Sequence, residues 1–183
     1  VLACLTGAMK KDPVTGIVTV DTECDNQWLA SQRIKPTLRN ILEIPRLQKL
    51  LEQFGVRPVY LVTYPVACDK ESIAILQPIW RNGECEIGTH LHAWTTPPVT
   101  VEEAENHAYL HNLPIELQRV KLATLTDAIT SNLGVTPHAY RGGRWSLDGT
   151  AVRLLEEFGY GVDSSVTPGI HWLDKGPDFR QAR

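Results

Sequence analysis

Two histidines separated by one residue, His90 and His92, are the side chains of this chain whose type and spacing most directly suggest chemistry. They end an apolar, strand-like run in the segment EIGTHLHAW. Alternate side chains of a strand point to the same face, so the two imidazoles can converge on a metal ion. A histidine is also commonly a hydrogen-bonding group without any ligand. A metal that activates water needs a third ligand, usually a carboxylate, and one open position.

Carboxylates that could supply this third ligand follow a β-branched run at residues 17–20. Asp21 and Glu23 have the same i, i+2 spacing as the histidines, and Asp25 comes next. One of the first two could bind the metal while the other accepts a proton from water. An acidic cluster after a strand is also typical of a helix cap or a solvated loop, and both interpretations are open from the spacing alone.

The elements that must position these side chains follow one repeated pattern of helix, glycine and strand. Apolar residues at helical spacing predict helices that end near residues 54, 133 and 158, each followed by a glycine and an apolar run. A fourth unit has a helix over residues 72–80 and a strand over residues 85–90. With residues 17–20, five strands alternate with helices, which predicts a parallel sheet in either a doubly wound layer or a barrel.

The candidate reactive residues all come at the ends of the expected strands. They are Asp21, Glu23, Thr63, Tyr64, His90, His92, Arg141, Arg144 and Asp163. We favour a barrel, because its rim gathers many strand ends into one pocket. The polar loop over residues 93–112 is expected to cover this rim as a lid or substrate wall. Within it, His107 and His111 have helical spacing, for which a solvated helix face is favoured over a second metal site.

Composition and charge indicate one ordinary globular domain over residues 1–183. The net charge of −3, without a basic run, argues against nucleic acid or an anionic membrane as a partner. No apolar run is long enough to span a membrane, and residues 1–9 lack the charged flank of a signal peptide. The four cysteines have no paired spacing, so we expect reduced thiols and a cytoplasmic protein.

Four short motifs resemble, in order, those of the polysaccharide deacetylases of the NodB-homology group, also called carbohydrate esterase family four. The first is VDTE, with Asp21 and Glu23, and the second is GTHLHAW, with both histidines. The third is YRGGRW, from Tyr140 to Trp145, and the fourth is DSS, at residues 163–165. The resemblance is closest to the WalW-like branch and covers the chain from about residue 17 onward.

The resemblance implies a distorted (β/α) barrel of the NodB-homology type and the metal-dependent removal of N-acetyl groups from an amino-sugar polysaccharide. It implies that Asp21 is the catalytic base and that Arg141 keeps it ionised. It implies a divalent metal on Glu23, His90 and His92, with zinc expected, although iron, cobalt or nickel suit the same ligands. The residues for which it implies substrate contacts are Trp94, Arg144, Trp145 and Asp163.

The chain departs from the family pattern at two places. The usual second histidine comes four residues after the first, where this chain has Trp94, so His92 is expected to replace it. The histidine that would act as general acid has no counterpart after Asp163, and His171 matches poorly. Because no closing apolar element follows, we expect a barrel that is incomplete at the C-terminus.

Other functions stay open alongside the deacetylase. A catalytically silent carbohydrate-binding relative is favoured if His92 does not bind the metal, and hydrolysis of another non-peptide C–N amide bond would use the same chemistry. A metal-free α/β domain that binds a small anion would use Arg141 and Arg144 as its anchors. A carbohydrate is the expected partner, and the sequence does not predict an oligomeric state.

Overall fold

A computed structural model describes residues 16–27, 36–99, 109–172 and 176–182. Five parallel strands form one sheet in the order β1-β2-β3-β4-β5. The strands are β1 (Thr19–Thr22), β2 (Val59–Val62), β3 (Glu86–Leu91), β4 (Ala139–Gly142) and β5 (Val162–Asp163). The α/β class and the parallel sheet that the sequence predicts are confirmed.

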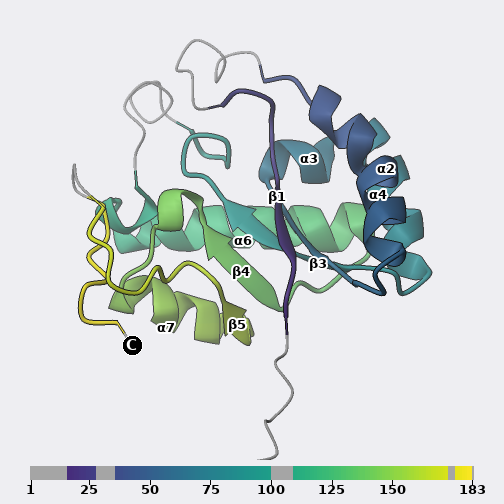
Figure 1. The fold of residues 1–183 in the computed structure, drawn as a ribbon. Helices are drawn as coiled ribbons and strands as arrows, with labels where there is room; N and C mark the ends of the chain where they lie inside the picture. Colours follow the sequence, from purple (N-terminus) through teal and green to yellow (C-terminus); the bar gives the residue numbers. More distant parts are fainter. Residues whose placement is uncertain (1–15, 28–35, 100–108, 173–175, 183) are drawn as a thin grey trace, which may run out of the picture.

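Helices connect each strand to the next, as the repeated pattern predicts. The described helices are η1 (Arg39–Glu43), α2 (Ile44–Glu52), α3 (Tyr64–Cys68), α4 (Lys70–Arg81), η2 (Leu110–Asn112), α6 (Ile115–Leu133), η3 (Gly143–Trp145) and α7 (Gly149–Glu157). Figure 1 shows the long helix α6 passing behind the strands, with α2 and α4 together at one side. Helix α6 packs against the sheet there and contacts β3.

Local signals set the helix boundaries. At the start of α4, the Asp69 carboxylate accepts a hydrogen bond from the Ser72 amide at 2.8 Å. Asp148 does the same for α7, accepting from the amides of Thr150 and Ala151. Gly134 ends α6 in the left-handed conformation, with φ of 79°, where a glycine carries no side-chain penalty. The chain can therefore turn at once into the next strand.

Apolar side chains between the sheet and the helices form the core. Tyr60 and Val62 of β2, Leu91 of β3, and Leu125 and Ile129 of α6 are completely buried. The packed core fixes the strands in register, with Asp21 level with Leu61 and His90 level with Arg141. The carboxyl ends of β1, β3 and β4 consequently lie at the same end of the sheet.

The expected barrel closure is not found. In the part of the chain that the structure describes, β1 and β5 are the two edges of the sheet and no pairing joins them. The strand expected near residues 160–166 is only Val162–Asp163, and five strands of this length leave the sheet open rather than closed on itself. The short helix α3, which follows β2 directly, was not predicted.

Among the helices that are described, none has the length and apolar composition needed to cross a membrane.

Candidate metal centre

His90 is delivered to the candidate site by β3 and is held in one orientation by the neighbouring strand. It is buried, and its Nδ1 lies 3.1 Å from the main-chain oxygen of Arg141 in β4. Because a carbonyl oxygen can only accept, Nδ1 carries a hydrogen, so Nε2 is the ring nitrogen that can bind a metal ion. A hydrogen bond from the remote ring nitrogen to a carbonyl is the usual support of a histidine that binds a metal.

Glu23 lies opposite both histidines, beyond the end of β1. Its Oε2 is 2.7 Å from Nε2 of His92 and 3.2 Å from Nε2 of His90. The Asn40 side-chain amide donates to the Glu23 main-chain oxygen at 2.9 Å and so fixes the backbone there. The two imidazole nitrogens and the carboxylate oxygen all lie within 4.8 Å of one another.

These three residues fit a divalent metal ion. Nε2 of His90 and Nε2 of His92 both face Oε2 of Glu23, so one metal ion could be bound by all three atoms. Two imidazoles with one carboxylate are the ligands of many catalytic zinc sites, and they also suit other transition metals. The structure thus brings together the three predicted metal ligands, with His92 in the position that the sequence assigned to it.

The pKa shifts of Glu23 and His92 also favour metal binding. Burial raises the pKa of the Glu23 carboxyl, but hydrogen bonds and charge interactions with His90 and His92 outweigh it and lower the pKa from 4.5 to about 2. Burial lowers the pKa of His92 from 6.5 to about 4; His90 adds to this effect and Glu23 opposes it. An ionised carboxylate and a neutral imidazole are the forms that bind a metal.

Asp21 and Arg141 form an ion pair beside the three ligands. Arg141 donates to Oδ1 of Asp21 at 2.6 Å, and Oδ2 of Asp21 lies 4.0 Å from Nε2 of His90. The guanidinium also donates to Thr19 at 2.8 Å and to the Ser164 hydroxyl at 3.1 Å. Arg141 is therefore fixed by β1 and by the residue that follows β5, and it leaves Oδ2 of Asp21 directed towards the site. Thr19 was not predicted as part of the site, and Ser164 was noted only within the DSS motif.

Two groups pack against the imidazole of His92. The Trp94 ring lies 4.2 Å from it, centre to centre. On Gly143, a Cβ atom would lie 2.2 Å from Nδ1 of His92, so only glycine fits there. The second of the two adjacent glycines in YRGGRW thus allows a close approach of the backbone to His92.

Arg144 and Trp145 lie in a cluster of aromatic side chains. The Arg144 guanidinium lies 4.2 Å from the centre of the Tyr109 ring, and Trp145 stacks on Trp172 at 4.1 Å with an angle of 8° between the planes. Arg144 and Trp145 also have left-handed backbone conformations, with φ of 56° and 57°. Such conformations are costly outside glycine and are found where the surrounding structure enforces them.

Asp163 lies at the junction of β4 and β5. Its carboxylate accepts from the Ser165 amide at 3.0 Å and from the Ser165 hydroxyl at 2.6 Å. The Ser165 hydroxyl accepts in turn from the Gly142 amide at 2.8 Å. Burial raises the pKa of Asp163, although Ser165 and Arg141 oppose this effect. Through Ser165, Asp163 thus helps to hold the chain after β5 against Gly142 of β4. Its predicted contact with substrate would be an additional role.

Asp25 and His111 are polar residues near the strand ends that have other partners. The Asp25 carboxylate accepts from the Thr37 hydroxyl and from the amides of Arg39 and Asn40, so it caps η1. His111 does not lie on a solvated helix face as expected; it is in η2, with Nδ1 2.8 Å from the Ser146 hydroxyl. His107 and the central part of the expected lid lie outside the described residues.

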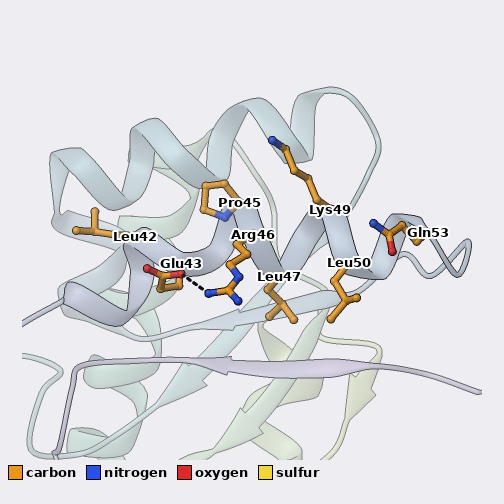
Figure 2. A pocket seen from close by; sticks show the side chains of 8 residues that line it. All are labelled: Leu42, Glu43, Pro45, Arg46, Leu47, Lys49, Leu50 and Gln53. Atoms are coloured by element: carbon orange, nitrogen blue, oxygen red, sulfur yellow. Dashed lines mark ion pairs between the residues drawn. The ribbon is translucent and has the colours of Figure 1, made fainter.

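A polar hollow of about 590 Å³ opens beside the proposed ligands. Its lining includes Asp21, Glu23, Arg39 and Asn40. A larger hollow of about 830 Å³ lies over η1 and α2, and Figure 2 shows its lining of aliphatic and of charged or polar side chains, with the Glu43 and Arg46 ion pair. It contains none of the predicted site residues, so the polar hollow is the candidate substrate site.

Comparison with known proteins gives no sequence match but a consistent structural one. No protein-family model and no curated protein matches the chain. A candidate polysaccharide deacetylase from Mycobacterium smegmatis is 22% identical, with a TM-score of 0.57, over 82% of this chain and 50% of that one. IcaB from Ammonifex degensii is 16% identical, with a TM-score of 0.54, over 80% and 57% of the two chains.

A third similar structure is a mutant, with restored enzymatic activity, of a CE4 family pseudoenzyme from Bacillus anthracis. It is 15% identical, with a TM-score of 0.53, over 81% of this chain and 43% of that one. The chain thus spans about half the length of the structures that it matches. At these identities the comparison shows the fold, an α/β fold with a parallel sheet that is similar to those of the CE4 proteins.

Proposed function

We propose that this chain is a metal-dependent hydrolase that removes N-acetyl groups from an amino-sugar polysaccharide. The observation that carries the proposal is the convergence of Glu23, His90 and His92 within 4.8 Å, with Asp21 held beside them by Arg141. The fold shared with proteins named as deacetylases supports the same activity, as does the order of the four motifs. The WalW-like branch and a distorted (β/α) barrel of the NodB-homology type are finer parts of this proposal.

The metal would be bound by Glu23, His90 and His92, and zinc is our proposed ion. When bound, such an ion lowers the pKa of a water ligand and polarises a carbonyl oxygen. The chain contributes the orientation of the ligands: the Arg141 carbonyl fixes His90, while Trp94 and Gly143 enclose His92. Rigid ligands reduce the reorganisation needed on binding.

Asp21 is the proposed base. Its Oδ1 is paired with Arg141, and its Oδ2, which lies 4.0 Å from Nε2 of His90, is the oxygen that would take a proton from water. Water would add to the acetyl carbon as Asp21 takes its proton, and the C–N bond would break as this proton passes to the nitrogen, so that acetate and the free amine of the sugar leave. Arg141 acts on Asp21 by hydrogen bonding and charge, which is the role expected from the sequence.

The further substrate contacts are proposed for residues at the strand ends and in the loops beyond them, none of which is among the residues that line the polar hollow. Trp94, which packs on His92, would lie beside the acetyl group. Arg144 and Trp145 would contact the sugar from the aromatic cluster, and Asp163 would do so from the end of β5. The size of the polar hollow, about 590 Å³, suits a ligand larger than acetate alone.

A second candidate is a carbohydrate-binding protein without catalysis. The observation in its favour is that one of the similar structures derives from a CE4 family pseudoenzyme. Hydrolysis of another non-peptide amide bond is a variant of the first proposal, and a panel of acetylated amines distinguishes it.

The test is metal analysis of the purified protein together with acetate release from an acetylated amino-sugar oligomer. The wild type should contain about one divalent metal ion per chain, as a three-ligand open site predicts. His90→Ala and His92→Ala should lose both the metal and the activity, whereas His138→Ala, at an exposed histidine before β4, should keep both. Metal without acetate release would favour the second candidate, and a metal-free wild type would refute the site.

A further inference from the structure

We infer that Lys121 is a positioning residue for the proposed metal centre and acts through the loop that follows β3. This inference rests on the proposed function and adds a residue that no motif contains. Lys121 lies on α6 and is completely buried, which is rare for a lysine. A buried ammonium group is costly unless all of its donors are satisfied, so its partners indicate what it stabilises.

Among the described residues, three main-chain carbonyl groups of one short loop accept hydrogen bonds from Lys121. Its Nζ donates to the oxygens of Ala93, Thr96 and Pro98 at distances of 2.5 to 2.8 Å. An ammonium group has three N–H donors, and three acceptors surround it here. Because this loop belongs to neither a strand nor a helix, its carbonyl groups depend on such a donor.

The same loop determines the position of His92. Ala93 follows His92 directly, and the amides of Thr95 and Thr96 donate to the His92 oxygen at 3.2 and 3.1 Å. Trp94, between the carbonyl groups that Lys121 binds, packs its ring on the His92 imidazole at 4.2 Å. Lys121 therefore fixes both the backbone after His92 and the ring that covers one side of the imidazole.

Removal of the ammonium group should loosen this loop and with it the orientation of His92. Loss of a residue that orients a metal ligand typically weakens metal binding by about 10- to 100-fold. We expect a loss in this range for Lys121→Met, which keeps a long unbranched side chain but has no donor. The metal probe is Zn²⁺, and its dissociation constant is measured by calorimetry on protein that circular dichroism shows to be folded.

Gln118→Met is the matched control. Gln118 lies on the same helix, is also buried, and donates to the Leu113 oxygen at 2.8 Å rather than to residues 93–98. It should lose stability but keep the wild-type affinity for Zn²⁺. The inference is overturned if folded Lys121→Met binds Zn²⁺ as the wild type does, or if Gln118→Met loses as much affinity.

Two further measurements cover the remaining outcomes. If Lys121→Met does not fold, Lys121→Ala is studied with added propylammonium, which returns the donors; affinity for Zn²⁺ should rise with the amine and not with propanol. Restored folding without restored affinity would refute the inference.

If the wild type binds no Zn²⁺, the proposed function fails, and spectra of ¹⁵N-labelled histidine in the metal-free proteins decide about Lys121. The His92 resonances, assigned with His92→Gln, should then shift in Lys121→Met but not in Gln118→Met. Unchanged His92 resonances in Lys121→Met would refute the role of Lys121 independently of the metal.

Discussion

Asp21 and Asp25 show how two aspartates four residues apart take different tasks. Asp21 has one oxygen on Arg141 and the other near His90, whereas both oxygens of Asp25 accept hydrogen bonds at the start of η1. The sequence placed both in one acidic cluster, and spacing could not separate them because their partners come from β4 and from the chain before α2. The difference becomes visible only with the fold.

Asp21→Asn should therefore remove the activity without removing the metal. The amide cannot accept a proton from water, and loss of a general base typically costs about 10²- to 10⁴-fold in rate. Acetate release and metal content are measured on the same preparation. Asp127→Asn is the control, since Asp127 is an exposed residue of α6 that does not line the hollow. Equal losses of activity in the two variants would contradict the assignment of Asp21.

His92 should make the stability of the metal-free protein depend on pH. Its pKa is lowered from 6.5 to about 4, mainly by burial, so between these values the unfolded chain binds a proton that the folded protein does not. The free energy of unfolding should thus fall as the pH is lowered from 6.5 to 4, by roughly 1–3 kcal/mol. Urea unfolding in the presence of a chelator measures this slope. His92→Gln should flatten it, and an unchanged slope in that variant would assign the effect to another group.

At the scale of elements, the sequence predicted what local pattern determines. Apolar periodicity and the glycines that follow it predicted α2, α4, α6 and α7, and these helices are found. The short elements α3 and η3 were missed because they have too few residues for a periodic signal. Lys121 was missed for a related reason: a lysine within a helix is ordinarily exposed, and its carbonyl partners lie in an irregular loop.

Gly143, the first residue of η3, gives a prediction at the scale of elements. Gly143→Ala should weaken metal binding by about tenfold and lower stability by about 1–3 kcal/mol, because the new Cβ would displace the His92 ring. Calorimetric metal titration and urea unfolding measure the two effects. Gly149→Ala is the control: it begins α7, where a Cβ meets nothing within 4 Å. Wild-type metal affinity in Gly143→Ala would show that the ring can move without loss.

For the whole molecule, the predicted parallel α/β fold is found, but the predicted barrel is not: the described strands form an open sheet. Parallel strands place Asp21, His90 and Arg141 near the same carboxyl end of the sheet whether or not the sheet closes. The prediction of the candidate site therefore did not depend on the choice between barrel and open sheet. Closure depends on which strands pair at the two edges, and no local pattern encodes this. The convergence of strand ends alone was thus not sufficient grounds to prefer a barrel.

Metal binding should stabilise the whole molecule, because its ligands come from strand ends far apart in the sequence. Glu23 lies beyond β1, and both histidines belong to β3 or follow it, so the bound ion links segments that separate on unfolding. At a free Zn²⁺ concentration of 100 times the dissociation constant, the gain is about 2.7 kcal/mol, or roughly 5–10 °C in melting temperature for a chain of this size. Thermal unfolding with Zn²⁺ and with chelator measures the difference. His90→Ala leaves only two of the three ligands, so it should bind Zn²⁺ too weakly to show this shift. An equal shift in that variant would place the stabilising ion elsewhere.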